Sequence, residues 1–541
     1  MNTKNMLFSI TFAYQKAACA TDTLICSDIC VSILKARGNA IDASVAAAIC
    51  IGTVSSQASG IGGGGFAVLD IKGESHFINF REMAPLAANK DMYTDPLNAQ
   101  KGPKSIATPG ELKGLFDMHS KFGKLPWADL LYPSIQLAKN GFKITAHVAK
   151  ALQKGRDGIL RDPGLSAVYS KEIDGKKVVV QEGDTIYRKN LATTLQLIAA
   201  SGIEEFYSGS IAKTMVNYIQ SNGGILSLQD LSRYKVEWSR PLHVKYKKYD
   251  VYTGIAPSGG PILAMMLKVA EQFKFSGNKG NLTDMHRIVE IMKHAYAKRS
   301  QLADPNFITN VTTLAKRIIT NKFAMGVYAR INDAKTYGPE YYNSTDEFFK
   351  DAGTTHLSVL DELGNSVSLT STVNLPFGSG IMDPITGIIF NDQMDDFSLP
   401  NQKNAFDLAP SAANFIDPLK RPQSSTVPTI IKYQGSTVMV VGGSGGSRIT
   451  SAVFKTIVDT LDRNITIHES IQSSRIHHQL YPNSIEIELD LPSSLVNGLK
   501  LKGHELKSEK MSFSAVQGIH VSNGIIYAES DKRKNGQPSG Y

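Results

Sequence analysis

The order of helical and strand patterns along the 541 residues is the feature that most constrains the fold. Residues 21–54 predict two helices with a break at Arg37-Gly38-Asn39, residues 66–80 predict two strands, and residues 105–235 are mostly helical by their apolar period. Further strands are predicted near 242–254, 386–390, 427–433 and 436–441, with helices near 262–273, 283–302 and 450–462. These patterns show no regular βαβ repeat. The chain is therefore predicted to form a layered α+β body and not a doubly wound sheet.

A change of periodicity at Thr354 marks the most regular strand pair. Residues 330–353 are polar and rich in turn signals, which predicts an exposed, flexible segment. The residues that follow alternate as a β-hairpin to about residue 375, with its turn centred on Leu363. A symmetric hairpin places Thr354 opposite Thr372, with Cβ atoms about 4.5–5.5 Å apart. Threonine is common in strands, so this pair by itself is also compatible with a purely structural role.

Two glycine-rich loops are candidate binding sites. Val440–Arg448 lies between a predicted strand and a predicted helix, where backbone N–H groups suit a phosphate or an oxyanion. The lysine of a P-loop is missing from it. Gly60–Gly65 matches G-x-G-x-x-G but is followed by a strand, which argues against a dinucleotide site. Either loop could instead serve close packing.

A third candidate is the acidic loop Asn391–Phe397, which follows the apolar run Gly387–Phe390. Its paired carboxylates suit a metal or a cationic amine, but no histidine is nearby in sequence, and a solvated loop is the alternative. A hydroxyl pair, an oxyanion loop and an amine-binding loop within about 100 residues together favour acyl transfer.

All four cysteines lie in the first 50 residues, at Cys19, Cys26, Cys30 and Cys50. No histidine accompanies them and no C-x-x-C motif occurs, which makes a zinc site improbable. One disulfide and two free buried thiols is the expectation from the residues alone.

Charge and hydropathy exclude two other classes. The net charge is +9, but the 58 Lys and Arg residues are scattered, and the local cluster Lys245, Lys247 and Lys248 is typical of a solvated edge strand and not of a nucleic-acid patch. Residues 6–14 are apolar but too short to span a bilayer, so no membrane anchor is evident. Sequons at Asn281, Asn310, Asn343 and Asn464 give weak support to a secretory route.

Seven motifs occur in a fixed order along the chain: Gly60–Phe66, Phe80–Pro85, Thr354–Ser358, Asn391–Ser398, Arg421–Ser425, Gly442–Arg448 and Pro538–Tyr541. In this order they resemble the γ-glutamyltransferase (γ-glutamyltranspeptidase) family of the N-terminal nucleophile hydrolase fold, from about Ala17 to Tyr541. The chain looks closest to the animal branch. That resemblance implies a disulfide between Cys26 and Cys50.

The resemblance also implies self-cleavage between Gly353 and Thr354. Residues 1–353 would form a large subunit and residues 354–541 a small one, and both would build one four-layer αββα sandwich. The α-amine that cleavage frees on Thr354 has a reference pKa of roughly 7.7–8.0, so it can act as the general base for the hydroxyl of the same residue.

Further site residues follow from the matched motifs. Thr372 matches the threonine that hydrogen-bonds the nucleophile, and Gly445 and Gly446 match the oxyanion-hole glycines. The remaining matches are substrate-binding residues: Arg81, Ser424 and Ser425 for the α-carboxylate of the γ-glutamyl group, and Asn374, Gln393 and Asp396 for its α-amine. A planar guanidinium suits bidentate binding of a carboxylate.

Some positions depart from the family's commonest patterns. Asp392 stands where asparagine is usual, Gln393 is the bacterial choice, and Ser444 and Thr426-Val427 are also unusual. None of these residues is expected to react with the substrate. The departures are therefore expected to affect the preference for acceptors and the reaction rate. The anchor helix of animal members is expected to be absent or truncated.

The sequence therefore predicts a self-processing enzyme that cleaves γ-glutamyl amides such as glutathione and transfers the γ-glutamyl group to water, amino acids or peptides. It is expected to need no metal or cofactor, to bind no nucleic acid and to be extracellular or at the cell surface. Two alternatives remain, an acylase of the same fold and an unprocessed homologue that only binds ligand. Arg81 and Asp396 argue against the acylase, because an acyl group without an amino acid head needs neither charge.

Overall fold

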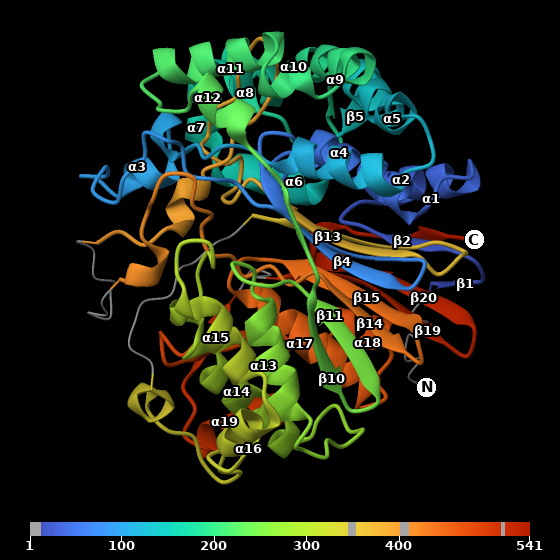
Figure 1. The fold of residues 1–541 in the computed structure, drawn as a ribbon, viewed down its shortest axis with the longest axis vertical. Coiled ribbons are helices and arrows are strands. Elements are labelled where there is room, and N and C mark those ends of the chain that lie inside the picture. Colours follow the sequence, from blue (N-terminus) through green and yellow to red (C-terminus); the bar gives the residue numbers. More distant parts are fainter. Residues whose placement is uncertain (1–11, 344–352, 401–409, 510–513) are drawn as a thin grey trace.

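The computed structural model describes residues 12–343, 353–400, 410–509 and 514–541. Most of the apolar N-terminal stretch and residues 344–352 of the predicted flexible segment lie outside the described residues. The described chain forms four layers, with two stacked sheets between two groups of helices (Figure 1). The predicted four-layer αββα architecture is confirmed.

Two seven-stranded antiparallel sheets form the centre of the molecule. The first runs in the order β21 (Ser539–Gly540), β2 (Ala18–Ala20), β12 (Thr355–Leu360), β13 (Ser366–Thr372), β3 (Gly64–Ile71), β4 (Glu74–Phe80) and β9 (Glu237–Ser239). The second runs β1 (Ala13–Tyr14), β20 (Ile525–Ser530), β19 (Ala515–Ser522), β15 (Ser436–Ser444), β14 (Thr429–Tyr433), β11 (Tyr249–Thr253) and β10 (Leu242–Tyr246). Each sheet contains strands from both sides of Gly353, so the two parts of the chain share one body.

The space between the sheets is apolar, with a few polar links. Phe66, Val68, Ile430 and Val440 are among the side chains buried there. The Ser368 hydroxyl donates to the Val441 carbonyl of the opposite sheet at 3.0 Å. Burial of each Ile, Val or Phe side chain stabilises the sandwich by about 1.5–3 kcal/mol.

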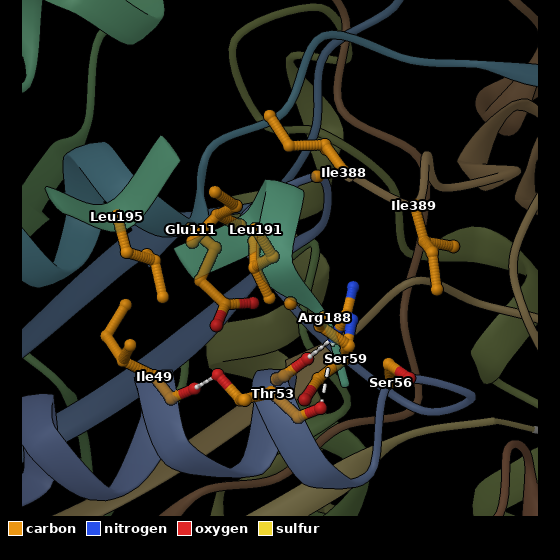
Figure 2. A pocket seen from close by; sticks show the side chains of 14 residues that line it. Ile49, Thr53, Ser56, Ser59, Glu111, Arg188, Leu191, Leu195, Ile388 and Ile389 are labelled. Atoms are coloured by element: carbon orange, nitrogen blue, oxygen red, sulfur yellow. Dashed lines mark hydrogen bonds between the residues drawn. The ribbon is translucent and has the colours of Figure 1, made fainter. Parts of the chain in front are cut away.

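The first helical layer covers β12, β13 and β3. Its members are α1 (Leu24–Lys35), α2 (Ala40–Val54), α3 (Leu97–Gln100), α4 (Glu111–Phe122), α5 (Trp127–Asn140), α6 (Ala146–Lys154), α7 (Arg156–Arg161), α8 (Pro163–Tyr169), α9 (Lys189–Ser201), α10 (Glu204–Tyr207), α11 (Ser210–Ser221) and α12 (Leu228–Arg233). Every residue of α2 is buried, which its run of alanine, valine and isoleucine allows. Asn39 caps its start, and Arg188 donates to the Gly52 and Thr53 carbonyls at its end, at 2.9 and 3.0 Å (Figure 2).

The second helical layer covers β11, β14 and β15. It comprises α13 (Gly260–Ala270), α14 (Leu282–Tyr296), α15 (Asn310–Ile318), α16 (Asn321–Tyr328), α17 (Arg448–Leu461), α18 (Ile467–Gln472) and α19 (Ser493–Leu501). Three small sheets lie outside these layers: β5 (Phe142–Lys143) with β8 (Thr185–Ile186), β6 (Ser170–Ile173) with β7 (Lys176–Val179), and β16 (Ile476–His477) with β17 (Ile485–Glu488) and β18 (Leu506–Glu509). The short 3₁₀ helices of the described chain are η1 (Pro103–Ser105), η2 (Arg299–Gln301), η3 (Pro339–Tyr342), η4 (Gln393–Asp396), η5 (Ala412–Asn414) and η6 (Lys532–Lys534).

The predicted hairpin register is confirmed. Thr355 pairs with Ser371 and Leu360 with Ser366, so Thr354 and Thr372 face each other at the open end. The cluster of lysines lies on and beside β10, the outer strand of its sheet, as predicted.

Two predictions of local structure were wrong. Residues 386–390 form no strand, only the isolated bridge between Met382 and Ile389, because Gly387 turns the chain with a φ of 70°. Within the predicted exposed segment, Tyr342 is only 1% exposed, because its hydroxyl donates to the buried carboxylate of Glu290 at 2.7 Å.

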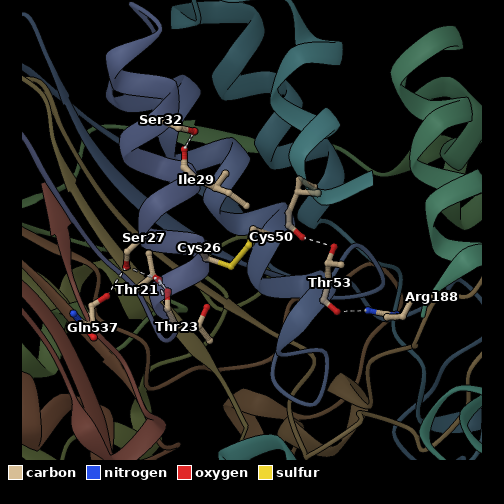
Figure 3. Close-up of a disulfide and its surroundings, with 11 residues drawn as sticks. Thr21, Thr23, Cys26, Ser27, Ile29, Ser32, Cys50, Thr53, Arg188 and Gln537 are labelled. Atoms are coloured by element: carbon tan, nitrogen blue, oxygen red, sulfur yellow. Dashed lines mark hydrogen bonds between the residues drawn. A yellow bond between two sulfur atoms is a disulfide. The ribbon is translucent and has the colours of Figure 1, made fainter. Parts of the chain in front are cut away.

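The cysteines form two disulfides. Cys26–Cys50 joins α1 to α2 as the resemblance implied (Figure 3). The expected free thiols are instead a second disulfide, Cys19–Cys30, with Cα atoms 6.3 Å apart. This pairing forms because β2 lies beside α1 in the fold, a contact that residue spacing does not report.

Candidate active site

The hairpin brings three groups together at the start of β12. The Thr354 hydroxyl donates to Thr372 Oγ1 at 3.3 Å, and Thr372 Oγ1 in turn donates to the Gly353 carbonyl at 2.6 Å. The Asn374 backbone N–H donates to the same Thr372 oxygen at 2.8 Å. Thr354 and Thr372 are only 5% and 3% exposed. The hydroxyl of one threonine therefore lies beside a peptide carbonyl that the other polarises.

Gly353 is confined by the loop after β13. A Cβ atom there would lie 2.3 Å from the Asn374 carbonyl oxygen, closer than atoms can approach. Only glycine therefore fits at this position without moving the loop.

A buried network behind Thr354 was not predicted. Lys534 Nζ donates to the Thr354 carbonyl and to Asp22, and the Asp22 carboxylate also accepts from Thr355 Oγ1 at 2.7 Å and Gln517 Nε2 at 2.6 Å. Asp22 and Lys534 lie near opposite ends of the chain and in no motif that names a chemistry. Only the closing motif Pro538–Tyr541 marked this region in the sequence.

The predicted oxyanion glycines lie between β15 and α17. Gly445 and Gly446 have φ values of 120° and 63°, which favour glycine. Within the described residues, neither N–H donates to a backbone carbonyl. Gly445 lines the same cleft as Thr354, so an N–H donor and a hydroxyl share one solvent-accessible space.

Arg81 and Asp396, two residues predicted to bind opposite ends of a zwitterion, form a buried ion pair. Arg81 Nη2 donates to Asp396 Oδ2, and the side chains are 1% and 6% exposed. Arg81 also donates to the Pro422 carbonyl at 3.3 Å and the Gln423 carbonyl at 3.1 Å. The two charges therefore neutralise each other in this structure.

The predicted amine-binding residues surround Asp396. Gln393 Nε2 donates to Asp396 Oδ2 at 2.7 Å, and Asn374 Nδ2 donates to the Asp392 carbonyl at 3.2 Å. The side-chain oxygens of Asn374 and Gln393 are buried and accept from no donor among the described residues. Two unsatisfied acceptors beside a carboxylate suit an ammonium group.

Ser424 and Ser425 follow the carbonyls that Arg81 contacts. Ser425 Oγ accepts from Arg299 Nη2 at 2.8 Å, and Ser424 Oγ accepts from the Thr426 N–H at 3.2 Å. The sequence analysis missed Arg299. Its backbone is held beside the predicted carboxylate site by Gln423, whose Nε2 donates to the Arg299 carbonyl at 2.6 Å.

Three buried carboxyl groups near this site have raised pKa values. Burial raises the pKa of Glu82 to about 8, against the opposing effect of Arg81, and burial raises the pKa of Glu111 to about 8. Burial, with Asp395 and Asp396 adding to it, raises the pKa of Asp392 well above its usual value. Glu82 and Glu111 are therefore mainly neutral at pH 7.

One group of described residues has ligand atoms near enough for a metal, His286, Glu290 and His504. His286 Nδ1 and His504 Nε2 already share a hydrogen bond of 2.8 Å, and Glu290 accepts from Tyr342. Lys293 Nζ lies 3.9 Å from Glu290 and adds a positive charge that disfavours a cation. These residues form a hydrogen-bonded network between α14 and the segment before Gly353.

A family model spans almost the whole described chain. The model described as gamma-glutamyltranspeptidase matches residues 26–541. The chain belongs to the gamma-glutamyltranspeptidase family. One relative, "Glutathione hydrolase proenzyme 2" of Schizosaccharomyces pombe, is 40% identical over 538 residues, which cover 97% of this chain and 87% of the relative.

Two solved structures are similar to this chain. The gamma-glutamyltranspeptidase of Helicobacter pylori has a TM-score of 0.57 at 30% identity, over 63% of this chain and 96% of that one. The cephalosporin acylase of Bacillus halodurans has a TM-score of 0.85 at 22% identity, covering 100% and 99% of the two chains. The acylase similarity shows a shared fold alone.

Proposed function

We propose that this protein cuts itself between Gly353 and Thr354 and then uses Thr354 to cleave γ-glutamyl amides such as glutathione. The γ-glutamyl group passes to water or to an amino acid or peptide acceptor. The observation that carries the proposal is the chain of contacts from the Thr354 hydroxyl through Thr372 to the Gly353 carbonyl.

Self-cleavage begins when Thr354 Oγ attacks the Gly353 carbonyl carbon and its proton is taken up by solvent or a neighbouring group. The Thr372 hydroxyl stabilises the charge that develops on the carbonyl oxygen. The C–N bond then breaks, the nitrogen gains a proton, and Gly353 is held as an ester on Thr354. Water opens the ester to give the Gly353 carboxylate and restores the Thr354 hydroxyl beside a free α-amine.

Turnover uses the same atoms with a different carbonyl. The free amine takes the proton of the Thr354 hydroxyl as its oxygen attacks the γ-glutamyl carbonyl, and the Gly445 and Gly446 N–H groups stabilise the oxyanion. The amine returns the proton to the leaving nitrogen. Water or an acceptor amine then attacks the acyl-Thr354 ester, which releases the γ-glutamyl group.

The buried pair of Arg81 and Asp396 supports an amino acid head over another acyl group. A zwitterion that enters between them gives the guanidinium a carboxylate and the aspartate an ammonium, so neither charge is left unpaired. Asn374 and Gln393 supply the remaining acceptors for the ammonium. Small γ-glutamyl compounds are thus the substrates, and the subunits 1–353 and 354–541 are each other's partners.

We further propose that the protein works outside the cytosol, because two disulfides are typical of an oxidising compartment. Asn310, Asn343 and Asn464 are exposed and available for glycosylation. No helix in the described ranges is long and apolar enough to cross a membrane. Free thiols at all four cysteines in protein from its native source would contradict this location.

Thr354→Ala tests the proposal. The variant should remain one chain of about the full 58.8 kDa and have no activity on a γ-glutamyl anilide, because alanine has no hydroxyl. Wild-type protein should give two fragments on a denaturing gel, with the smaller beginning Thr-Thr-His-Leu-Ser by N-terminal sequencing. Thr354→Ser is the matched control and should still process. An active wild-type enzyme that stays a single chain would overturn the mechanism.

A further inference from the structure

A cleft of about 540 Å³ opens beside Thr354. Thr354 and Gly445 form part of its wall, and α6 and η6 provide much of the rest. This volume is within the range typical of small-molecule sites, roughly 300–1,000 Å³. Arg81, Asn374 and Asp396 are not among its lining residues, so the cleft is separate from the predicted site for the γ-glutamyl head.

The cleft is strongly basic. Among the described residues that line it none is acidic, whereas six are lysine or arginine: Lys150, Lys154, Arg448, Lys532, Arg533 and Lys534. Three of these cations have acidic partners, since Arg448 pairs with Glu486, Arg533 with Glu488, and Lys534 with Asp22.

The other three cations have no such partner. In the described part of the chain, Lys150, Lys154 and Lys532 form no ion pair, and all three are exposed. Lys150 and Lys154 are four residues apart on α6, so they lie on one face of that helix. The cleft therefore has a net positive charge available to an incoming anion.

The tetrahedral carbon formed at Thr354 has its substituents in separate directions. One is the Thr354 oxygen, one is the oxyanion, one leads to the γ-glutamyl head, and one is the nitrogen of the leaving or attacking amine. If the head occupies the site of Arg81 and Asp396, the amine side needs a different space that also meets Thr354 and Gly445. The basic cleft is such a space.

We propose that this cleft binds the terminal carboxylate of the peptide that leaves from, or accepts, the γ-glutamyl group, through Lys150 and Lys154. The inference rests on the proposed function and adds the recognition of the second half of the substrate. Leaving group and acceptor share the site, because acceptor attack is the reverse of leaving-group departure.

The test first removes the terminal carboxylate from the substrate and then removes the two lysines from the protein. Wild-type protein should prefer glutathione over its C-terminal amide by roughly three- to tenfold in kcat/KM, as expected for two partly exposed charge pairs. Lys150→Gln/Lys154→Gln should reduce that preference to nearly one. Its kcat/KM for a γ-glutamyl anilide, whose leaving group has no carboxylate, should stay within about twofold of wild type.

Lys139→Gln/Lys143→Gln is the matched control, because it removes two exposed lysines outside the cleft. It should keep the wild-type preference. Raising the salt concentration should weaken the preference in the wild type, because the lysines are exposed to solvent. Glycylglycine and its amide, offered as acceptors, should show the same pattern.

The outcomes separate the two proposals. An unchanged preference in the Lys150→Gln/Lys154→Gln variant, or no preference in wild type, overturns the carboxylate site while leaving the γ-glutamyl activity standing. A processed wild-type protein that does not act on the anilide overturns the proposed function itself.

Discussion

Thr372 is the residue on which the contacts of the proposed cleavage site converge. Its oxygen accepts from Thr354 and from the Asn374 N–H, and its hydroxyl donates to the Gly353 carbonyl. Thr372→Val keeps the shape but removes these hydrogen bonds, and the loss of buried bonds to a developing charge costs about 1.5–3 kcal/mol. Self-cleavage should slow by about ten- to a hundredfold, measured as conversion of single chain to fragments on a gel. Thr372→Ser should cleave near the wild-type rate, and equal rates for both variants would contradict the role.

Arg81 tests substrate recognition apart from self-cleavage. Arg81→Gln should leave cleavage intact and lower kcat/KM on a γ-glutamyl anilide by about ten- to a hundredfold, because a charged hydrogen bond to substrate is lost. Removing one member of the buried pair also leaves Asp396 uncompensated, which costs stability. The double variant Arg81→Gln/Asp396→Asn should recover thermal stability but no activity. Recovery of activity would show that Arg81 acts only through the fold.

At the scale of elements, two disulfides bind α1 to its neighbours. Cys26–Cys50 spans 24 residues and Cys19–Cys30 spans 11. Cross-links of these lengths stabilise a fold by roughly 3 kcal/mol each, mainly by restricting the unfolded chain. Cys26→Ala/Cys50→Ala and Cys19→Ala/Cys30→Ala should each lower the free energy of unfolding by about that amount in urea titrations. Peptide maps without reductant should show both links, and a scrambled pairing would contradict this arrangement.

At the scale of the whole molecule, the buried carboxyls make stability depend on pH. Glu111 has a pKa of about 8 in the fold and 4.5 as its ordinary value. Below pH 4.5 the group is protonated in both states, and its contribution is fully present. As pH rises from 4.5 to 8, the unfolded state releases the proton that the folded state keeps, so stability falls by up to about 1.4 kcal/mol per pH unit.

Glu111→Gln removes this loss, so its free energy of unfolding should rise relative to wild type between pH 5 and pH 8. Urea titrations at four pH values measure the difference. Glu182→Gln, at an exposed position, is the control and should follow the wild-type slope. A constant difference between Glu111→Gln and wild type across this range would show that Glu111 is ionised in the fold.

Features set by neighbouring residues were predictable from the sequence. The hairpin from Thr354 to Thr372, the helix pair within 21–54 and the glycine loop before α17 follow from local period, turn residues and backbone freedom. The site residues were predicted from sequence motifs, because hydrophobic periodicity indicates secondary structure and burial but not chemical role. The false strand at 386–390 shows the limit, because a short apolar run reports burial and not conformation.

Contacts between distant segments were decided by the tertiary structure alone. Arg81 and Asp396 are 315 residues apart in the sequence. The residues next to each one are equally compatible with a solvated charge and with a buried ion pair. Cys19 forms a disulfide with Cys30 because β2 packs beside α1. The lysines of α6 and η6 line the same cleft because both elements border Thr354. The physical reason is common to these cases: local patterns determine which face of an element is apolar, whereas the partner of each polar group depends on how the layers pack.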